Sequence, residues 1–209
     1  MTSRGRFITL EGGEGAGKST QVRRLAAALE ERGLPVLVTR EPGGSEGGEA
    51  IRGLLLQGDA ARWSARAETL LFAAARADHV EKRIRPALAA GRWVVCDRFL
   101  DSTRAYQGAS GVEDAPILAL HGFGAEGLLP DRTFVLDLPP EDGAGRAALR
   151  DGDANDRFGA RDAAFHAAVA AGFRRIAAAE PHRVRLVDAR ASIEAVTNTV
   201  LAGLRDLLP

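Results

Sequence analysis

The sequence has a single cysteine, Cys96, among its 209 residues. One thiol cannot form a disulfide within the chain, so a disulfide-stapled scaffold is excluded. Cys96 lies in the apolar run 93–96, which predicts a buried, inert thiol and a reducing, cytoplasmic location. The sequence also lacks any run of 18 apolar residues and any apolar signal-like stretch after Met1. We therefore expect neither export nor a membrane-spanning segment.

Net charge is absent as well, because 28 Lys and Arg residues balance 28 Asp and Glu residues. A chain without excess positive charge is not expected to hold nucleic acid by bulk electrostatics. We find neither an internal repeat nor a Cys/His cluster with metal-ligand spacing. The length suits one α/β domain, and we expect a single domain over residues 1–209.

The stretch from Gly12 to Ser19 reads GGEGAGKS and fits the phosphate-loop pattern G-x-x-x-x-G-K-[ST]. An expected strand at 7–10 precedes it and an expected helix follows it, which is the context that this motif requires. Its glycines let successive backbone N–H groups turn inward at the positive end of the helix dipole. Lys18 is then expected at the β and γ phosphates of ATP, and the Ser19 hydroxyl at Mg²⁺.

The periodicity of the following residues predicts a βαβ unit. Apolar residues recur at helical spacing to about residue 32, and the apolar run 34–39 reads as the second strand. Such a unit implies a parallel sheet with ligands at the carboxyl ends of its strands. The polar loop 40–48 leaves that edge, either as a flexible connector or as a substrate-contacting loop.

Two later strands end in aspartates that could bind Mg²⁺ or its water shell. The apolar run 93–96 leads into Asp97 and Arg98, and the strand 133–138 contains Asp137. We prefer Asp97, because Arg98 beside it could bind a phosphate, whereas the prolines after Leu138 suggest that Asp137 precedes a chain exit.

A long helical region is expected over 65–90, kinked or restarted at Pro86. Phe72 and Arg76 are four residues apart there, so their side chains lie next to each other on the helix. Either Phe72 stacks on a base while the Arg76 guanidinium binds the edge of that base, or Phe72 is a core residue and Arg76 faces solvent. The polar stretch 102–108 has a composition that suits either a base edge or a surface turn.

The most polar part of the chain, about 141–161, is either a solvated helix–loop or a short mobile lid that brings arginines to a transferring phosphoryl group. Further on, we expect a helix over 163–180, a strand over 184–188 and a last helix capped by Ser192. The lid arginines are Arg146, Arg150, Arg157 and Arg161.

A GTPase switch would share the phosphate loop but needs an N-K-x-D guanine motif, which this sequence lacks. Five segments instead resemble, in the same order, those of the bacterial thymidylate kinase family. These segments are 11–20 (EGGEGAGKST), 39–44 (TREPGG), 68–76 (ETLLFAAAR), 97–99 (DRF) and 105–108 (AYQG).

The resemblance implies a three-layer α/β/α P-loop fold with a five-stranded parallel sheet and a homodimer. It also implies transfer of the γ-phosphoryl group of ATP to dTMP. In this sequence the ATP loop would comprise Gly12, Gly13, Glu14, Gly15, Ala16, Gly17, Lys18, Ser19 and Thr20. Asp97 and Ser19 would position Mg²⁺, partly through water.

For the acceptor, the resemblance implies that Glu14 contacts the 3′-hydroxyl, Phe72 stacks on thymine and Arg76 donates to a thymine carbonyl. Further implied contacts are Thr103 and Gln107 to the base, Arg52 and Arg98 to the monophosphate, and Tyr106 where a 2′-hydroxyl would clash. Lys18, Arg98 and Arg150, our first choice among the lid arginines, would surround the phosphoryl group in flight. The alternatives are another pyrimidine monophosphate kinase, acting on dUMP, UMP or CMP, and a non-catalytic nucleotide-binding regulator.

Overall fold

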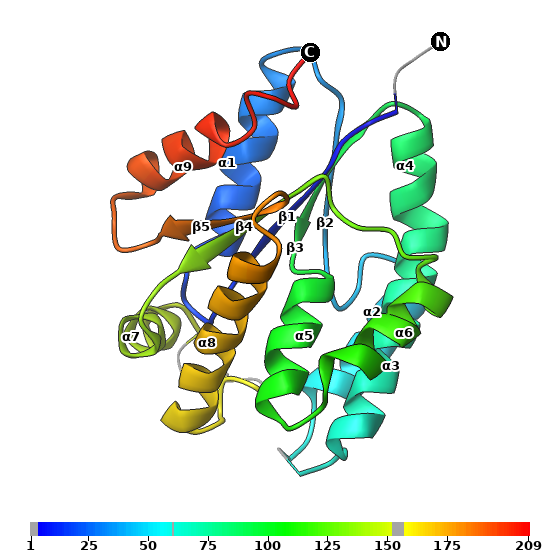
Figure 1. Ribbon diagram of the computed structural model, residues 1–209, viewed down its shortest axis with the longest axis vertical. Helices are drawn as coiled ribbons and strands as arrows, with labels where there is room; N and C mark the ends of the chain where they lie inside the picture. Colours follow the sequence, from blue (N-terminus) through cyan, green and yellow to red (C-terminus); the bar gives the residue numbers. More distant parts are fainter. Residues whose placement is uncertain (1–3, 60, 152–156) are drawn as a thin grey trace.

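A computed structural model describes residues 4–59, 61–151 and 157–209, and only the backbone of residues 144 and 147–151. At least one helix lies between each strand and the next along the chain (Figure 1). The strands are β1 (Phe7–Gly12), β2 (Val36–Arg40), β3 (Trp93–Asp97), β4 (Arg132–Asp137) and β5 (Val184–Asp188). The helices are α1 (Lys18–Glu30), α2 (Glu46–Leu56), α3 (Ala65–His79), the π-helical turn η1 (Val80–Ile84), α4 (Arg85–Ala89), α5 (Leu100–Ala109), α6 (Asp114–Gly124), α7 (Pro140–Asp151), α8 (Ala163–Ala179) and α9 (Ile193–Ala202).

The strands form one five-stranded sheet in the order β2-β3-β1-β4-β5. Every pairing is parallel, with Leu10 of β1 opposite Asp97 of β3 and Phe134 of β4. The expected five-stranded parallel sheet is confirmed. Because the chain passes from β3 on one side of β1 to β4 on the other, a crevice opens at the carboxyl ends of these three strands.

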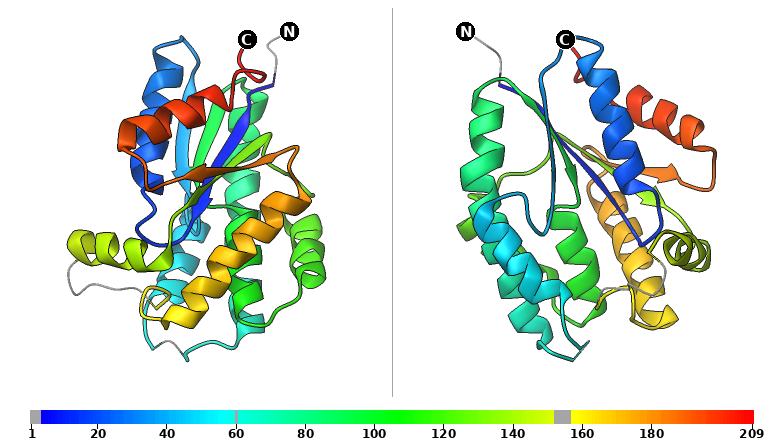
Figure 2. Two further views of the ribbon diagram at one scale, coloured as in Figure 1. Left: turned by 60° about the vertical axis from the view of Figure 1, so that its left-hand side comes forward. Right: turned by 180° about the vertical axis from the view of Figure 1, so that it is seen from behind.

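Helices cover both faces of the sheet, so the molecule has three layers (Figure 2). On one face, α1 and α9 pack on side chains such as Ile8, Leu10 and Phe134. On the other face, α4, α5 and α6 cover β1 and β3, while α8 covers β4 and β5. Cys96 is fully buried between this second face of the sheet and its helices, as expected.

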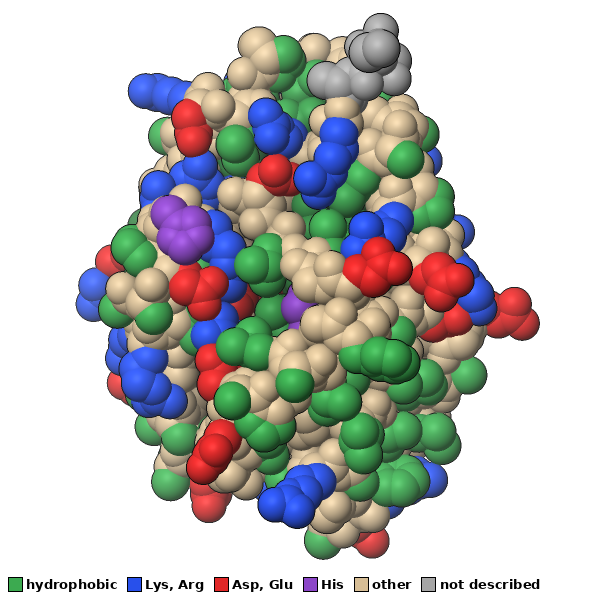
Figure 3. Space-filling view, turned by 45° about the vertical axis from the view of Figure 1, so that its right-hand side comes forward, with side chains coloured by type: hydrophobic (Ala, Val, Ile, Leu, Met, Phe, Trp, Pro, Cys, Tyr) green, Lys and Arg blue, Asp and Glu red, His purple; other side chains and the backbone are tan. Residues whose placement is uncertain are grey.

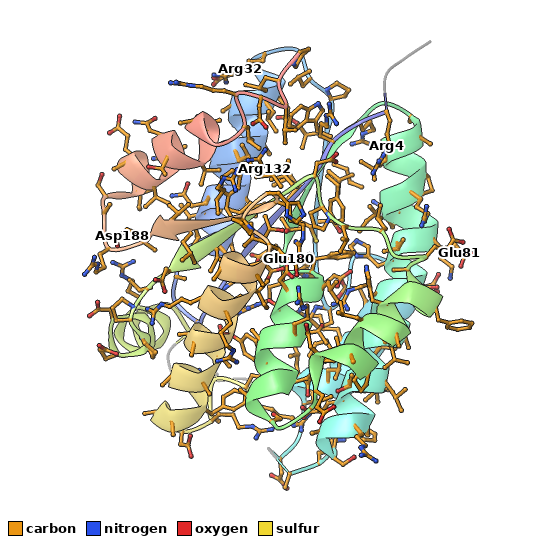
Figure 4. The ribbon with its side chains drawn as sticks, viewed as in Figure 1. Arg4, Arg32, Glu81, Arg132, Glu180 and Asp188 are labelled. Carbon is orange, nitrogen blue, oxygen red and sulfur yellow. The ribbon has the colours of Figure 1, made fainter. Side chains whose placement is uncertain are left out.

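A cluster of buried charges fastens α5 to the end of α8 beside the sheet. Glu180, labelled in Figure 4, accepts hydrogen bonds from Arg104 (2.6 Å) and Arg183 (2.7 Å). Arg183 also donates to Asp101 on α5 (2.7 Å). Because each buried charge has opposite charges against it, the cluster avoids the large cost of an unpaired buried ion. It fixes α5, which carries several of the site residues.

The expected element boundaries are close to those observed, with three differences. Helix α6 (Asp114–Gly124) lies in a stretch for which the sequence predicted no element. The predicted helical region 65–90 is continuous but includes the π-helical turn η1 just before Pro86. Because proline has no N–H to donate, the wider turn of η1 lets the helix continue through Pro86. The stretch 102–108, expected as a base edge or a surface turn, belongs to the regular helix α5. Ser192 caps α9 as expected, accepting from the N–H of Ala195 (3.2 Å). No helix in the described ranges is long and apolar enough to cross a membrane.

Candidate active site

The loop from Gly12 to Ser19 joins β1 to α1 at the crevice, as its sequence predicts. Gly15 and Gly17 have φ angles of 66° and 90°, a conformation that glycine adopts without the cost of a Cβ atom. Gly17 is the N-cap of α1, so the loop ends at the helix N-terminus, where unpaired N–H groups favour an anion. The geometry is that of a phosphate-binding loop.

Lys18 is buried and its ammonium lies over this loop. Its Nζ donates to the carbonyl oxygens of Gly13 (2.6 Å) and Gly12 (3.2 Å). Burial, with a smaller contribution from the charge of Arg98, lowers the pKa of Lys18 to about 8. A bound polyphosphate would favour the charged form and is therefore attracted to this position.

Ser19 and Asp97 meet beside the loop. The Ser19 hydroxyl donates to Asp97 Oδ2 (2.7 Å) at the carboxyl end of β3. The rival carboxylate, Asp137 of β4, is instead held by both Nε (3.0 Å) and Nη2 (2.9 Å) of Arg174. A hydroxyl and a carboxylate are the oxygen ligands that Mg²⁺ takes together with phosphates and water, so the residues present fit this ion. No group of three or more acidic, His or Cys residues in the described ranges could hold a metal by itself.

Arg98, Glu14 and Tyr106 form a compact polar cluster next to Lys18. Arg98 Nη2 donates to Glu14 Oε1 (2.7 Å) and to the Tyr106 hydroxyl (3.1 Å), and the Tyr106 hydroxyl also donates to Glu14 Oε1 (2.9 Å). Burial alone would lower the pKa of Arg98, but the oxygens of Tyr106 and Glu14 outweigh it and raise the pKa. Arg98 has a φ of 68°, an uncommon backbone conformation for a residue with a side chain. Its guanidinium is thus permanently charged and held in one place.

One cavity of about 500 Å³ runs from the phosphate loop to α3, a size typical of small-molecule sites. The loop end is lined by Lys18, Ser19 and Asp97, and the far end by Phe72 and Arg76. Other predicted site residues on its wall are Glu14, Gly15, Gly17, Thr20, Arg52, Arg98, Thr103 and Tyr106.

At the far end, the side chains are arranged for a planar ligand. Phe72 packs against Phe158, with ring centres 5.8 Å apart. Arg76 is only 3% exposed and donates to Thr103 Oγ1 (2.7 Å). Arg52 also lines the cavity and donates to the Pro42 carbonyl (2.8 Å). An aromatic ring beside a fixed donor can stack on a base and read its edge.

Some predicted residues lie elsewhere. Gly12, Gly13 and Ala16 belong to the loop but not to the cavity wall. Gln107 is fully buried behind the wall, and within the described ranges neither atom of its amide group has a hydrogen-bond partner. The side chain of Arg150 lies outside the described part of the chain.

Arg157 differs from the expectation of a solvated or lid arginine. It is buried, donates to Glu68 Oε1 (2.6 Å) and also donates to the carbonyls of Leu55 (2.8 Å) and Asp59 (2.7 Å). Its guanidinium therefore anchors the segment after residue 156 to α2 and α3. Arg146 donates to the Ala189 carbonyl (3.1 Å).

Sequence reasoning missed three buried residues around the site. Glu11 accepts from the Phe99 N–H (2.7 Å) and the Ser102 hydroxyl (2.5 Å), while Glu41 and His79 lie behind Arg76. Glu11 and Glu41 could have been found by the signal that identified Asp97, because both stand at the carboxyl end of a parallel strand. His79 is three residues after Arg76 and so lies on the same helix face.

The thymidylate kinase family model matches residues 10–200. A thymidylate kinase of Rhizorhabdus wittichii is 63% identical over 98% of this chain and 99% of its own length. One of Caulobacter vibrioides is 54% identical over 95% of each chain. The crystal structure of thymidylate kinase from Ehrlichia chaffeensis superposes with a TM-score of 0.78 at 33% identity, covering 97% of this chain and 99% of that one.

Proposed function

Because the chain belongs to the thymidylate kinase family and phosphorylates dTMP with ATP, we propose that the transfer takes place in the cavity between the phosphate loop and α3. The observation that carries this proposal is the continuity of that cavity. Its two ends, at Lys18 and at Phe72, open into one space. One end suits a triphosphate and the other a base, so the two phosphate chains meet between them.

On the ATP side, the backbone N–H groups from Gly12 to Thr20 bind the β and γ phosphates, and Lys18 adds its charge. Ser19 and Asp97 would hold Mg²⁺, partly through water, and its charge would offset that of the phosphates. On the dTMP side, Phe72 stacks on thymine, Arg76 donates to a carbonyl, and Thr103 adds a contact from α5. The proposed base contact of Gln107 requires its buried amide group to reach the cavity from behind the wall.

Between the two sides, Arg98 and Arg52 hold the acceptor phosphate, and Glu14 accepts from the 3′-hydroxyl beside Tyr106. The acceptor oxygen is already a competent nucleophile, so no covalent enzyme intermediate is needed. Catalysis consists of positioning and of stabilising the charge that spreads over the transferring group. Lys18, Arg98 and Arg150 supply that stabilisation.

We further propose that residues 141–161 act as a lid within a single domain over residues 1–209. The support is the contact of α7 with the loop: a Cβ added at Gly15 would lie 2.1 Å from the Gly143 carbonyl oxygen. The backbones of α7 and of the loop are thus in direct contact. Arg150 comes from the same helix.

A homodimer and a cytoplasmic location complete the proposal. Several large hydrophobic side chains are exposed on neighbouring helices, with Phe123 of α6 91% and Leu70 of α3 56% exposed. Exposed apolar surface of this kind favours a protein partner. The buried free thiol of Cys96 suits a reducing compartment, and recovery outside the cytoplasmic fraction of lysed cells would contradict that location.

The experiment that tests the site is the substitution Lys18→Ala, with dTDP measured by chromatography. Removing a charge that stabilises the transferring group is expected to lower kcat about 10²–10³-fold. The matched control is Lys82→Ala, which removes the only other lysine of the chain from an exposed position on η1. Turnover of Lys18→Ala equal to that of the control would refute the proposed site.

A further inference from the structure

The guanidinium of Arg76 is fixed from three sides. Its Nε donates to Glu41 Oε2 (2.8 Å) and its Nη2 to Thr103 Oγ1 (2.7 Å). Its central carbon lies 5.0 Å from the centre of the Phe99 ring, within cation–π range. The orientation of this arginine is therefore set by protein contacts alone, without a ligand.

Glu41 is the charged member of this set and has a second partner behind it. Its Oε1 lies 3.0 Å from His79 Nδ1, and His79 Nε2 lies 2.7 Å from Thr39 Oγ1. With the proton on Nδ1, His79 donates to Glu41 and accepts from the Thr39 hydroxyl. A carboxylate that is only 6% exposed is costly unless it is paired, and here both of its oxygens are.

The loop after Glu41 packs directly on this pair. Gly44 has a φ of 81°, and a Cβ there would lie 2.3 Å from His79 Nε2 and 2.5 Å from Thr39 Oγ1. The same loop accepts the hydrogen bond from Arg52 through the Pro42 carbonyl (2.8 Å). Residues 41–44 thus contact both Arg76, which is proposed to bind the base, and Arg52, which is proposed to bind the acceptor phosphate.

We propose that Glu41, backed by His79, is a positioning and specificity residue that locks Arg76 as a donor toward the acceptor base. This inference rests on the proposed role of Arg76. A donor fixed in place can donate a hydrogen bond to a ring carbonyl oxygen, whereas an amino group at the same position would face it as a second donor. Such a mismatch is costly in a buried site. The lock therefore favours dTMP over dCMP, in which an amino group replaces the carbonyl.

The test is Glu41→Gln, which preserves side-chain size but removes the charge from the pair. We expect the KM for dTMP to rise about tenfold with little change in kcat, because ground-state and transition-state binding are lost together. The ratio of kcat/KM for dTMP to that for dCMP should fall by a similar factor. The KM for ATP should stay within about twofold, because the altered pair does not touch the phosphate loop.

A matched pair of histidine variants keeps the test decisive even if Glu41→Gln does not fold. The amide nitrogen of asparagine can replace Nδ1, so His79→Asn keeps the bond to Glu41, whereas His79→Gln replaces Nε2 and loses it. His79→Gln should lower the dTMP/dCMP ratio and His79→Asn should leave it near that of the wild type. Equal ratios in the two variants would overturn the proposal.

Two further variants separate the possible failures. Asp206→Asn weakens another acid–arginine pair (2.6 Å to Arg132) at the amino end of β4, away from the base end, so it reports a general loss of stability without a change in the ratio. Arg76→Ala should abolish the preference for dTMP over dCMP. If it does and Glu41→Gln does not, the inference about Glu41 is wrong. If Arg76→Ala also leaves the ratio unchanged, the proposed base contact is wrong.

Discussion

At the residue scale, the site is built from buried and half-buried charges that neutralise one another. Arg98 contacts Glu14, Arg76 contacts Glu41, and Glu11 lies behind Ser102, which accepts from Arg98 (3.1 Å). Such pairs contribute little net stability, because desolvation offsets the attraction. Their effect is to hold each guanidinium at a defined position, which phosphoryl transfer requires.

Glu11 is the residue whose charge state should affect stability most visibly. Burial and the nearby charge of Asp101 raise its pKa from 4.5 to about 7. The folded protein therefore binds more protons than the unfolded chain between these pH values. The contribution of Glu11 to the free energy of unfolding consequently decreases as the pH rises from 4.5 to 7. The full change is on the order of 3 kcal/mol.

We expect Glu11→Gln, which imitates the neutral side chain, to lack this dependence. Urea unfolding of both proteins at pH 5 and pH 8 isolates the contribution of Glu11, because the titration of groups that do not interact with Glu11 cancels in the difference. The free energy of unfolding of the wild type minus that of the variant should be smaller at pH 8 by about 2–3 kcal/mol. A difference that is constant or grows with pH would show that the carboxylate is stabilised in the folded state.

At the scale of elements, the sequence predicted those whose apolar pattern is regular and missed those that depend on tertiary contacts. The strands and α1 follow from buried runs and from the glycine loop. Helix α5 was not recognised, because its buried polar residues, such as Asp101 and Gln107, hide its inner face. Buried polar residues escape a search for apolar periodicity, since their partners come from distant segments.

The same reason explains which site residues could be predicted. Lys18 and Ser19 belong to a local motif whose spacing alone carries the chemistry. Asp97 and Arg98 were predicted from their place after a strand, and the structure brings both to the loop. The partnership of Glu41 with Arg76 spans 35 positions, and no local pattern indicates it. Only the fold brings the two together.

At the scale of the whole molecule, the cavity lies at the carboxyl ends of the strands. The outer surfaces of α2, α3 and α6 are therefore available for other contacts. In Figure 3, hydrophobic side chains gather at the lower right, over α3 and α6. Those exposed on these helices include Leu54, Leu70 and Phe123. A dimer through this surface would bury them while the cavity stays open to nucleotides.

We expect sedimentation equilibrium to give twice the chain mass of 22.1 kDa. The double variant Leu70→Ser and Phe123→Ser should shift the mass toward that of one chain, because it removes apolar surface from the interface. The matched control is Leu186→Ser on the edge strand β5, which is 46% exposed. A wild type that sediments as one chain at micromolar concentration would contradict the dimer.

The central claim, one cavity that takes ATP at one end and dTMP at the other, is tested most directly by a panel of acceptors. ADP release from ATP is measured with dTMP, dUMP, UMP and CMP as acceptors. We predict the highest kcat/KM for dTMP, by about tenfold or more over dUMP, because one methyl group in a fitted pocket is worth at least that factor. UMP and CMP should be poorer still, through the 2′-hydroxyl and, for CMP, the amino group. A preference for another monophosphate, or ADP release that does not depend on the acceptor, would contradict the account.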